Sequence, residues 1–227
     1  MIWVLVILYV RRLLRGTGKT KSQRISRPER NISFLLCFLL SALTPLQSQN
    51  KHLSFKVLKG NKTLGKIDMQ RIVRNDSTYY KAENQIKFKF IREIEIEARE
   101  NSVYHEEKLQ FSEINRSING SAKPRILLHY SKGRYRASRG NQTIELPDAP
   151  ISTNLITLYF KEPYDGMEVY CDNHQEFSRV HKIAQDKYLV TLPNGGRNIF
   201  HYNNGHCVRV IAIQPLFQVQ LIAMNNE

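Results

Sequence analysis

The amino-acid sequence predicts a mostly β protein, with one large, curved antiparallel meander and a single short helix on its concave face. The meander is expected to be a half-barrel or an incompletely closed barrel. From residue 53 onward, β-branched and aromatic residues alternate with polar ones at a period of two. Turn-forming residues interrupt this alternation every 8 to 12 positions. Residues 151–163 lack the alternation and separate two sets of strand-like segments.

The first 49 residues differ in composition from the rest. They hold eight Lys or Arg residues and one acidic residue, Glu29. The apolar run 32–46 follows this basic stretch and precedes the polar segment 47–49, which is the order of regions in a secretory signal peptide. We therefore divide the chain into an N-terminal extension explained by a misassigned start codon (1–30), a signal peptide (31–49) and one β-meander domain (50–227). A transmembrane anchor is the alternative for the apolar run.

The formal net charge of +14 is concentrated in this N-terminal region. Residues 50–227 carry 26 basic and 19 acidic side chains that are interspersed along the strands. Such a mildly basic surface does not predict nucleic-acid binding. The signal peptide instead predicts an exported protein, with no nucleic acid among its partners.

The strand-like segments follow one another along the chain with tight turns between them. Asn119-Gly120 is the strongest hairpin signal, because this pair favours positive φ at both positions. The segments are residues 53–58, 64–73, 78–90, 94–98, 103–114, 125–130, 134–138, 143–146, 175–183, 187–192, 198–202, 207–213 and 217–223. Long amphipathic strands in one meander coil, and a two-sheet sandwich is the alternative arrangement.

Residues 151–163 predict the helix that fills the curved sheet. Ser152 or Thr153 is expected to cap it, and Pro163 ends it. Its apolar face consists of Leu155, Ile156, Leu158, Tyr159 and Phe160.

The sequence shows no pattern for catalysis, a metal or a cofactor. The histidine pairs 174/181 and 201/206 lack zinc-ligand spacing, and no Gly-x-Ser-x-Gly nucleophile motif occurs. The carboxylates Glu93, Glu95, Glu97 and Glu100 lie along or near one strand, and three of them share a face. Solvation explains this pattern better than acid–base catalysis. We expect no cofactor and lean towards a protein that is not an enzyme.

Cys171 and Cys207 remain after removal of the signal peptide. In an oxidising compartment they are a candidate disulfide, and two separately packed thiols are the alternative.

The segment Leu158-Tyr-Phe-Lys-Glu-Pro163, together with the turns at Asn194-Gly195 and Asn204-Gly205, resembles a family of exported bacterial proteins of unknown function. The resemblance covers about residues 50–224 and implies a β-meander and export to the periplasm or cell envelope of a Gram-negative bacterium. More distantly, the layout is similar to that of periplasmic half-barrels that carry lipids or lipoproteins. No activity comes with this resemblance.

We therefore predict a binding or carrier module for an apolar ligand such as a lipid. Its candidate ligand-binding residues are Tyr159, Phe160, Glu162, Tyr164, Phe88, Phe90 and Phe111. For the aromatic residues the alternative is an ordinary core, and for Glu162 it is a salt bridge to Lys or Arg. Two other functions remain open: an envelope assembly protein that binds a partner protein through its sheet edges, and a hydrolase without a recognisable motif. The sequence does not predict an oligomeric state.

Overall fold

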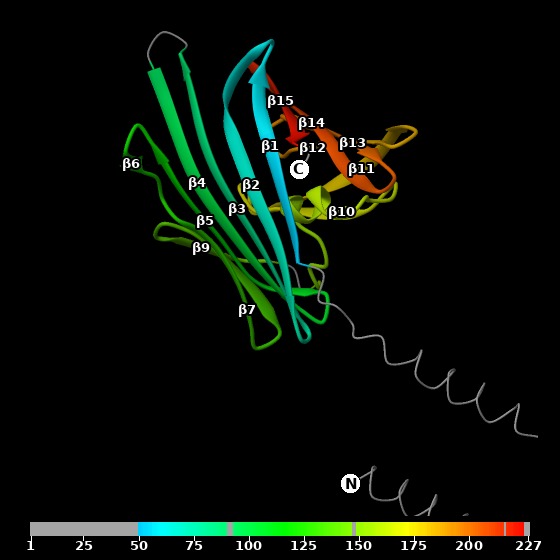
Figure 1. Cartoon of the computed structure of the whole chain (residues 1–227). Helices are drawn as coiled ribbons and strands as arrows, with labels where there is room; N and C mark the ends of the chain where they lie inside the picture. The colour runs from blue at the N-terminus through cyan, green and yellow to red at the C-terminus, as the bar shows by residue number, and fades with distance from the viewer. Residues whose placement is uncertain (1–49, 90–92, 147–148, 216, 225–227) are drawn as a thin grey trace, which may run out of the picture. The chain divides into compact units, whose positions relative to one another are not determined.

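The computed structural model describes residues 50–89, 93–146, 149–215 and 217–224. The predicted N-terminal extension and signal peptide lie outside these residues. The strands, coloured along the chain in Figure 1, are β1 (Lys51–Lys59), β2 (Lys62–Arg74), β3 (Ser77–Lys89), β4 (Glu93–His105), β5 (Lys108–Ile118), β6 (Ser121–Ala122), β7 (Ile126–Ser131), β8 (Arg134–Arg139), β9 (Gln142–Glu145), β10 (Glu168–Cys171), β11 (Glu176–Ala184), β12 (Lys187–Thr191), β13 (Arg197–Asn203), β14 (His206–Gln214) and β15 (Phe217–Met224).

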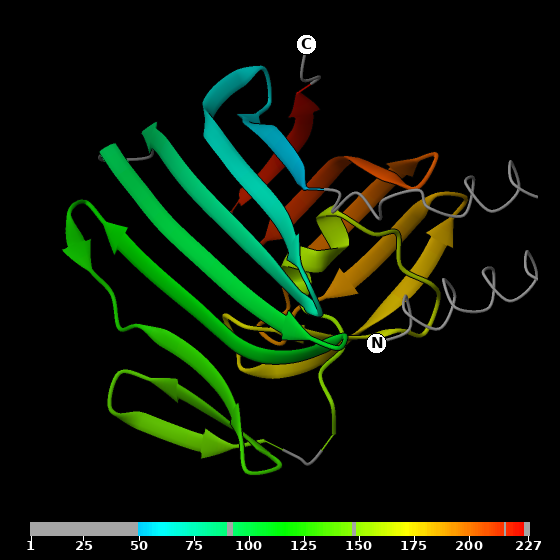
Figure 2. The same ribbon diagram turned by 60° about the horizontal axis from the view of Figure 1, so that its bottom comes forward.

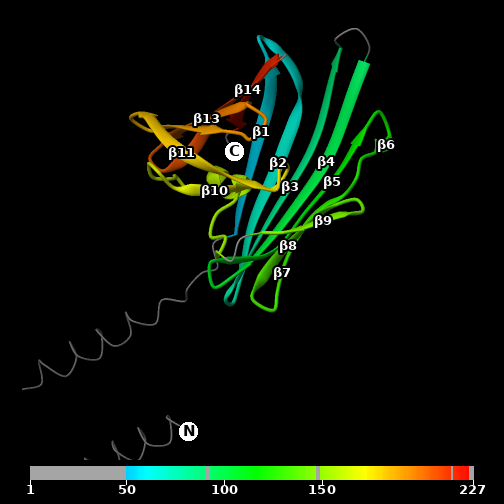
Figure 3. The ribbon, with the colours of Figure 1, turned by 180° about the vertical axis from the view of Figure 1, so that it is seen from behind.

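These strands form one 15-stranded sheet with antiparallel neighbours. β10 to β15 follow chain order, β15 pairs with β1, and β1 to β5 then continue into β7, β8 and β9 (Figure 3). β6 pairs with β5 beside this path. β9 and β10 are the ends of the sheet and do not pair with each other in the described part of the chain. The predicted mostly β, antiparallel and incompletely closed architecture is confirmed.

Alternation along the strands separates two faces. In β3 and β4, Ile86 lies opposite Ile96. The neighbouring pair, Lys87 and Glu95, forms an ion pair of 2.7 Å on the other face. The predicted turn after β5 has φ values of 50° at Asn119 and 73° at Gly120, so the expected positive-φ turn is present.

The predicted helix is wrong in kind. The structure has a 3₁₀ helix, η1 (Leu155–Tyr159), and neither Ser152 nor Thr153 caps it. Asn154 holds the N-cap position but makes no side-chain cap, because its amide is hydrogen-bonded to other strands. The bonds from Thr157 N to Asn154 O (3.1 Å) and from Phe160 N to Thr157 O (3.0 Å) span three residues, which is the 3₁₀ pattern.

η1 packs against the face of the sheet that we call the inner face; the opposite face is the outer face. The ring of Tyr159 lies between Phe55 of β1, at 5.3 Å between centroids, and Phe200 of β13, at 5.5 Å. Ile156 and Leu158 are buried. Figure 2 shows η1 between the blue-to-green strands and the orange strands. The central part of the prediction, an aromatic segment inside a curved sheet, therefore describes the structure.

The backbone just before η1 links two parts of the sheet that do not pair directly. Leu109 N of β5 donates to Ile151 O at 2.8 Å, and Tyr170 N of β10 donates to Thr153 O at 2.9 Å. The Tyr135 hydroxyl accepts from Ile151 N at 3.1 Å and donates to Leu109 O at 2.9 Å. The backbone of residues 151–154 thus joins β5 to β10, which do not pair with each other directly.

Candidate functional site

A buried polar cluster lies on the inner face beside η1. Asn154, at 0% exposure, accepts a hydrogen bond from the Tyr104 hydroxyl at 2.9 Å. Its amide nitrogen donates to Ser102 Oγ at 2.9 Å and to Asp172 Oδ2 at 3.0 Å. Ser112 Oγ donates to Asp172 Oδ1 at 2.5 Å. The cluster joins β4, β5, η1 and the end of β10 through satisfied hydrogen bonds, as buried polar groups require.

Glu100 lies next to this cluster on the inner face of β4, opposite Ala82 of β3 and Ile114 of β5. Its side chain is partly exposed. Burial raises the pKa of the Glu100 carboxyl to about 8, and the negative charge of Asp172 acts in the same direction. Burial also raises the pKa of Asp172, although its bonds from Ser112 and Asn154 oppose the shift. Asp172 therefore ionises first, and Glu100 is a neutral hydrogen-bond donor near pH 7.

Beyond η1, the inner face of β3 to β5 is apolar and incompletely covered, and Figure 1 shows these strands continuing past η1. The side chains here are partly exposed: Ile86, Phe88, Ile94, Ile96 and Ile118. Phe88 also contacts Phe217 of β15 at 6.5 Å between ring centroids. β1 and β2 separate β3 from β15 in the sheet, so this contact spans the inner side of the curve. We call this surface the apolar strip.

Asn84 lies between the apolar strip and the polar cluster. It pairs with Ala98, one position along the inner face from the pair of Ala82 with Glu100. Its Oδ1 atom is buried and has no hydrogen-bond partner in the described structure. An unpaired buried acceptor is unfavourable, so this atom is a place where a ligand hydroxyl or N–H group gains a bond.

A polar hollow of about 590 Å³ lies across β2 to β5. Most of its lining side chains belong to the outer face, where Lys66 pairs with Asp68 at 2.7 Å and Arg99 with Glu83 at 3.5 Å. Its charges are mixed and largely paired with each other, so it offers no single chemistry to a ligand.

The structure brings together part of the predicted ligand-binding set. Tyr159 and Phe160 lie in η1 and directly after it, and Phe160 contacts Tyr80 at 5.4 Å between centroids. Phe88 lies in the apolar strip. Glu162 accepts a hydrogen bond from the Tyr188 hydroxyl at 2.9 Å, and this contact takes the place of the expected ion pair.

Two predicted residues, Phe111 and Tyr164, are not brought to this face. Phe111 precedes Ser112, whose side chain points to Asp172, so alternation places Phe111 on the outer face opposite Val103. Tyr164 is 68% exposed in the loop after η1. Phe90 lies outside the described residues.

Residues 55–223 match the family model DUF6134, a domain of unknown function. The chain belongs to the DUF6134 family. One solved structure similar to this DUF6134 chain is the β-barrel-like protein of domain of unknown function DUF1849 from Brucella abortus, with 8% identity and a TM-score of 0.49, covering 78% of this chain and 96% of that one. No curated protein matches the present chain significantly. The expected membership of a family of unknown function is confirmed.

The described part of this DUF6134 domain has no group of three or more His, Cys, Asp or Glu side chains placed to hold a metal ion. No helix in the same residues is long and apolar enough to cross a membrane. Ser112 and Asp172 are paired, but the hydrogen bonds of their cluster include no histidine, so this cluster is not a Ser-His-Asp triad.

The two cysteines of the DUF6134 domain are separate thiols. Cys171 of β10 lies 3.3 Å from Ser178 Oγ of β11. Cys207 of β14 directs its sulfur to Arg209 O at 3.9 Å. Burial raises the pKa of both thiols, to about 11 for Cys171 and about 12 for Cys207, so both are protonated and inert near neutral pH. The candidate disulfide is not formed in this structure.

The sequence analysis attributed Glu100 to solvation and did not single out Asn154 or Asp172. A signal existed for Glu100: Glu93, Glu95 and Glu97 share the outer face by period two, and the spacing from Glu97 to Glu100 is odd. Glu100 therefore had to lie on the inner face. Asn154 and Asp172 gave no local signal, because their partners are 18 to 60 residues away in the sequence.

Proposed function

We propose that this DUF6134 domain binds an amphiphilic ligand with one acyl chain and a neutral, hydroxyl-bearing head group. The apolar strip is the observation that carries this proposal: a run of aliphatic and aromatic side chains on the inner face that the described chain leaves partly exposed. Soluble domains rarely leave such side chains in contact with water without a partner. Export to the cell envelope, which the signal peptide predicts, gives such a module access to lipids.

The polar end of the strip supports a neutral head group. Asn84 Oδ1 is a buried acceptor without a partner, and Glu100 next to it is a carboxylic acid kept neutral by burial. A ligand hydroxyl can donate to the first and accept from the second. A fatty-acid carboxylate is disfavoured there, because Asp172 already places a negative charge in the same low-dielectric region.

Calorimetric titration with oleoyl glycerol tests this proposal, with oleate as the anionic comparison. We expect oleoyl glycerol to bind and oleate to bind more weakly. The double variant Phe88→Ser/Ile96→Ser removes apolar contact area and is expected to weaken binding about tenfold or more. The control variant is Lys81→Ser, which changes an exposed residue on the outer face of β3 and is expected to leave binding unchanged. Absence of binding, or equal binding by both variants, contradicts the proposal.

A second candidate, a protein that assembles with an envelope partner through a sheet edge, is favoured by β9. All four of its residues are exposed, and it is an end of the sheet. An exposed edge strand offers unpaired backbone groups to another chain. Stable co-purification of a partner from envelope extracts, lost when Thr143→Pro is introduced in β9, distinguishes this candidate from a lipid carrier.

A further inference from the structure

The net positive charge of the β domain has a single source. Residues 114–144 contain seven Lys or Arg residues and no Asp or Glu. The rest of residues 50–227 contains 19 basic and 19 acidic residues, which cancel. This segment comprises the end of β5 and all of β6, β7 and β8, with most of β9; we call it the basic lobe.

The charges of the basic lobe face solvent. All seven basic side chains are exposed. In Figure 2 the lobe occupies the green end of the sheet, on the far side of the long strands from the orange β13 and β14. A set of like charges at one end of a domain creates a local field that attracts a polyanionic surface.

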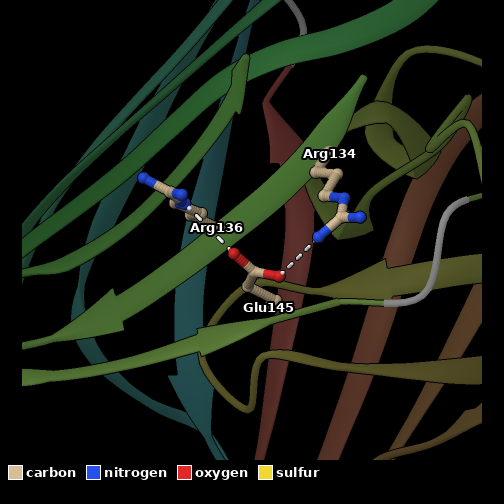
Figure 4. Close-up of polar contacts among 3 residues, drawn as sticks. All are labelled: Arg134, Arg136 and Glu145. Carbon is tan, nitrogen blue, oxygen red and sulfur yellow. Dashed lines mark hydrogen bonds and ion pairs between the residues drawn. The ribbon is translucent and has the colours of Figure 1, made fainter. Parts of the chain in front are cut away.

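Nearby carboxylates neutralise this charge only in part. Glu145 lies 3.3 Å from Arg134 and 3.4 Å from Arg136, so one carboxylate serves two guanidinium groups (Figure 4). Glu113 pairs with Arg125 at 2.6 Å. Two carboxylates against seven cations leave a clear excess of positive charge.

The lobe also carries an exposed apolar residue at its edge. Ile144 of β9 is 48% exposed, and its neighbour in β8, Ala137, is fully buried. Paired residues share a sheet face, so Ile144 lies with Ala137 on one face of β8 and β9, and Arg134 and Arg136 lie with Glu145 on the other face. A bilayer surface that meets the free edge of the sheet at β9 contacts both faces, with basic side chains at its phosphate head groups and Ile144 at the boundary with the acyl chains.

A nucleic-acid partner fits less well. Binding of single strands relies on aromatic side chains that are free to stack on bases. The aromatic residues of the lobe are Tyr130 and Tyr135, whose rings contact each other at 4.8 Å. Lys108 Nζ lies 3.5 Å from the centroid of the Tyr130 ring. Neither ring is available for stacking.

We propose that the basic lobe binds the surface of an anionic phospholipid bilayer. This inference rests on the charge distribution and is independent of the apolar strip. Co-sedimentation with lipid vesicles tests this proposal. The full chain is mixed with vesicles of phosphatidylcholine that do or do not contain phosphatidylglycerol. We expect binding to the phosphatidylglycerol vesicles that weakens as NaCl is raised, and little binding to phosphatidylcholine alone.

Two variants with equal loss of charge locate the surface. Lys132→Gln/Arg134→Gln/Arg136→Gln removes three of the seven positive charges of the lobe and is expected to weaken vesicle binding at least about tenfold. Lys56→Gln/Lys81→Gln/Lys187→Gln removes exposed charges elsewhere and is expected to leave binding within about threefold of the original. Residues 1–49 are also basic, so if the full chain binds, the same comparison is repeated on a chain that begins at residue 50. An equal loss of vesicle binding in the two triple variants overturns the proposal.

Two further results separate the alternatives. Ile144→Ser is expected to weaken binding in a way that NaCl does not change, because it removes an apolar contact. Tighter binding to a DNA duplex than to phosphatidylglycerol vesicles at the same NaCl concentration also overturns the proposal. The lobe triple variant is expected to bind oleoyl glycerol normally, so failure of the membrane surface and failure of the acyl-ligand site are distinguishable.

Discussion

At the residue scale, Glu100 couples protonation to folding. Its pKa is about 8 in the folded protein against a usual value of 4.5, because burial disfavours the carboxylate. Between these values the folded state keeps a proton that the unfolded state has released. The free energy of unfolding therefore falls as pH rises from about 4.5 to about 8. The proximity of Asp172, an acidic neighbour, strengthens this dependence.

Glu100→Gln is expected to remove this part of the pH dependence, because the amide has the same shape and no charge. At pH 8 the variant should be more stable by roughly 1–3 kcal/mol, which is less than the full shift implies since the side chain is partly exposed. Denaturant unfolding at pH 5 and pH 8 measures the difference. Glu97→Gln, on the outer face of the same strand, is the control. An unchanged slope for Glu100→Gln contradicts the assigned pKa.

Asn154 is the residue on which the buried polar cluster depends, because it contacts Tyr104, Ser102 and Asp172 and is fully buried. Asn154→Ala leaves several of these groups without partners and is expected to lower the free energy of unfolding by about 2–4 kcal/mol. Tyr104→Phe removes one bond and is expected to cost about 1 kcal/mol. Chemical denaturation measures both, and similar losses in the two variants would show that the cluster is not held through Asn154.

At the element scale, η1 contributes through its aromatic side chains more than through its helical hydrogen bonds. Tyr159→Ala removes a ring held between Phe55 and Phe200 and is expected to destabilise the domain by about 2–4 kcal/mol. Tyr159→Phe keeps both ring contacts and is expected to change stability by less than about 1 kcal/mol. Thermal unfolding of the two variants compares them; equal destabilisation would mean that the hydroxyl group, and not the ring, is what η1 provides.

The strands were predictable because their information is local. The alternation of Ile86 and Phe88 with Lys87 assigns strand and face at once, and Asn119-Gly120 assigns the turn. The kind of helix at residues 155–159 was not predictable in this way. Asn154 at its N-cap makes no side-chain cap, and the side chain is instead hydrogen-bonded to Ser102 of β4 and to Asp172, which lie 52 and 18 residues away in the sequence.

The candidate site was predictable only in part, because the sequence shows local alternation but not the contacts between distant segments. Phe88 and the apolar residues around it follow from period two, but the sequence gives equal weight to Phe111, which the bulge between Val103 and Tyr104 and the strand register place on the outer face. The basic lobe is the opposite case, because 31 consecutive residues without a carboxylate are visible in the sequence. What the sequence lacks is the arrangement that gathers these charges at one end of the sheet.

At the scale of the whole domain, the pairing of β15 with β1 holds the fold together. The first nine strands and the last six form two series, and β15 joins them by pairing with both β1 and β14. Leu221 is buried at this junction, opposite Val57 of β1 and Val210 of β14. In the described chain no other strand pairing joins the two series, so β15 provides the strand pairing that makes them one sheet.

Removal of residues 215–227 therefore tests whether the domain folds as one unit. The deletion exposes the backbone edges of β1 and β14 and part of the core next to η1, so we expect a loss of cooperative unfolding and of amide protection in both series. Hydrogen exchange measured strand by strand distinguishes the possibilities. The conservative variant Leu221→Val, which keeps the strand, is expected to retain protection with a loss of about 1 kcal/mol. Persistent protection of β2 to β5 in the deletion would show instead that the first series folds alone and that β15 only docks onto it.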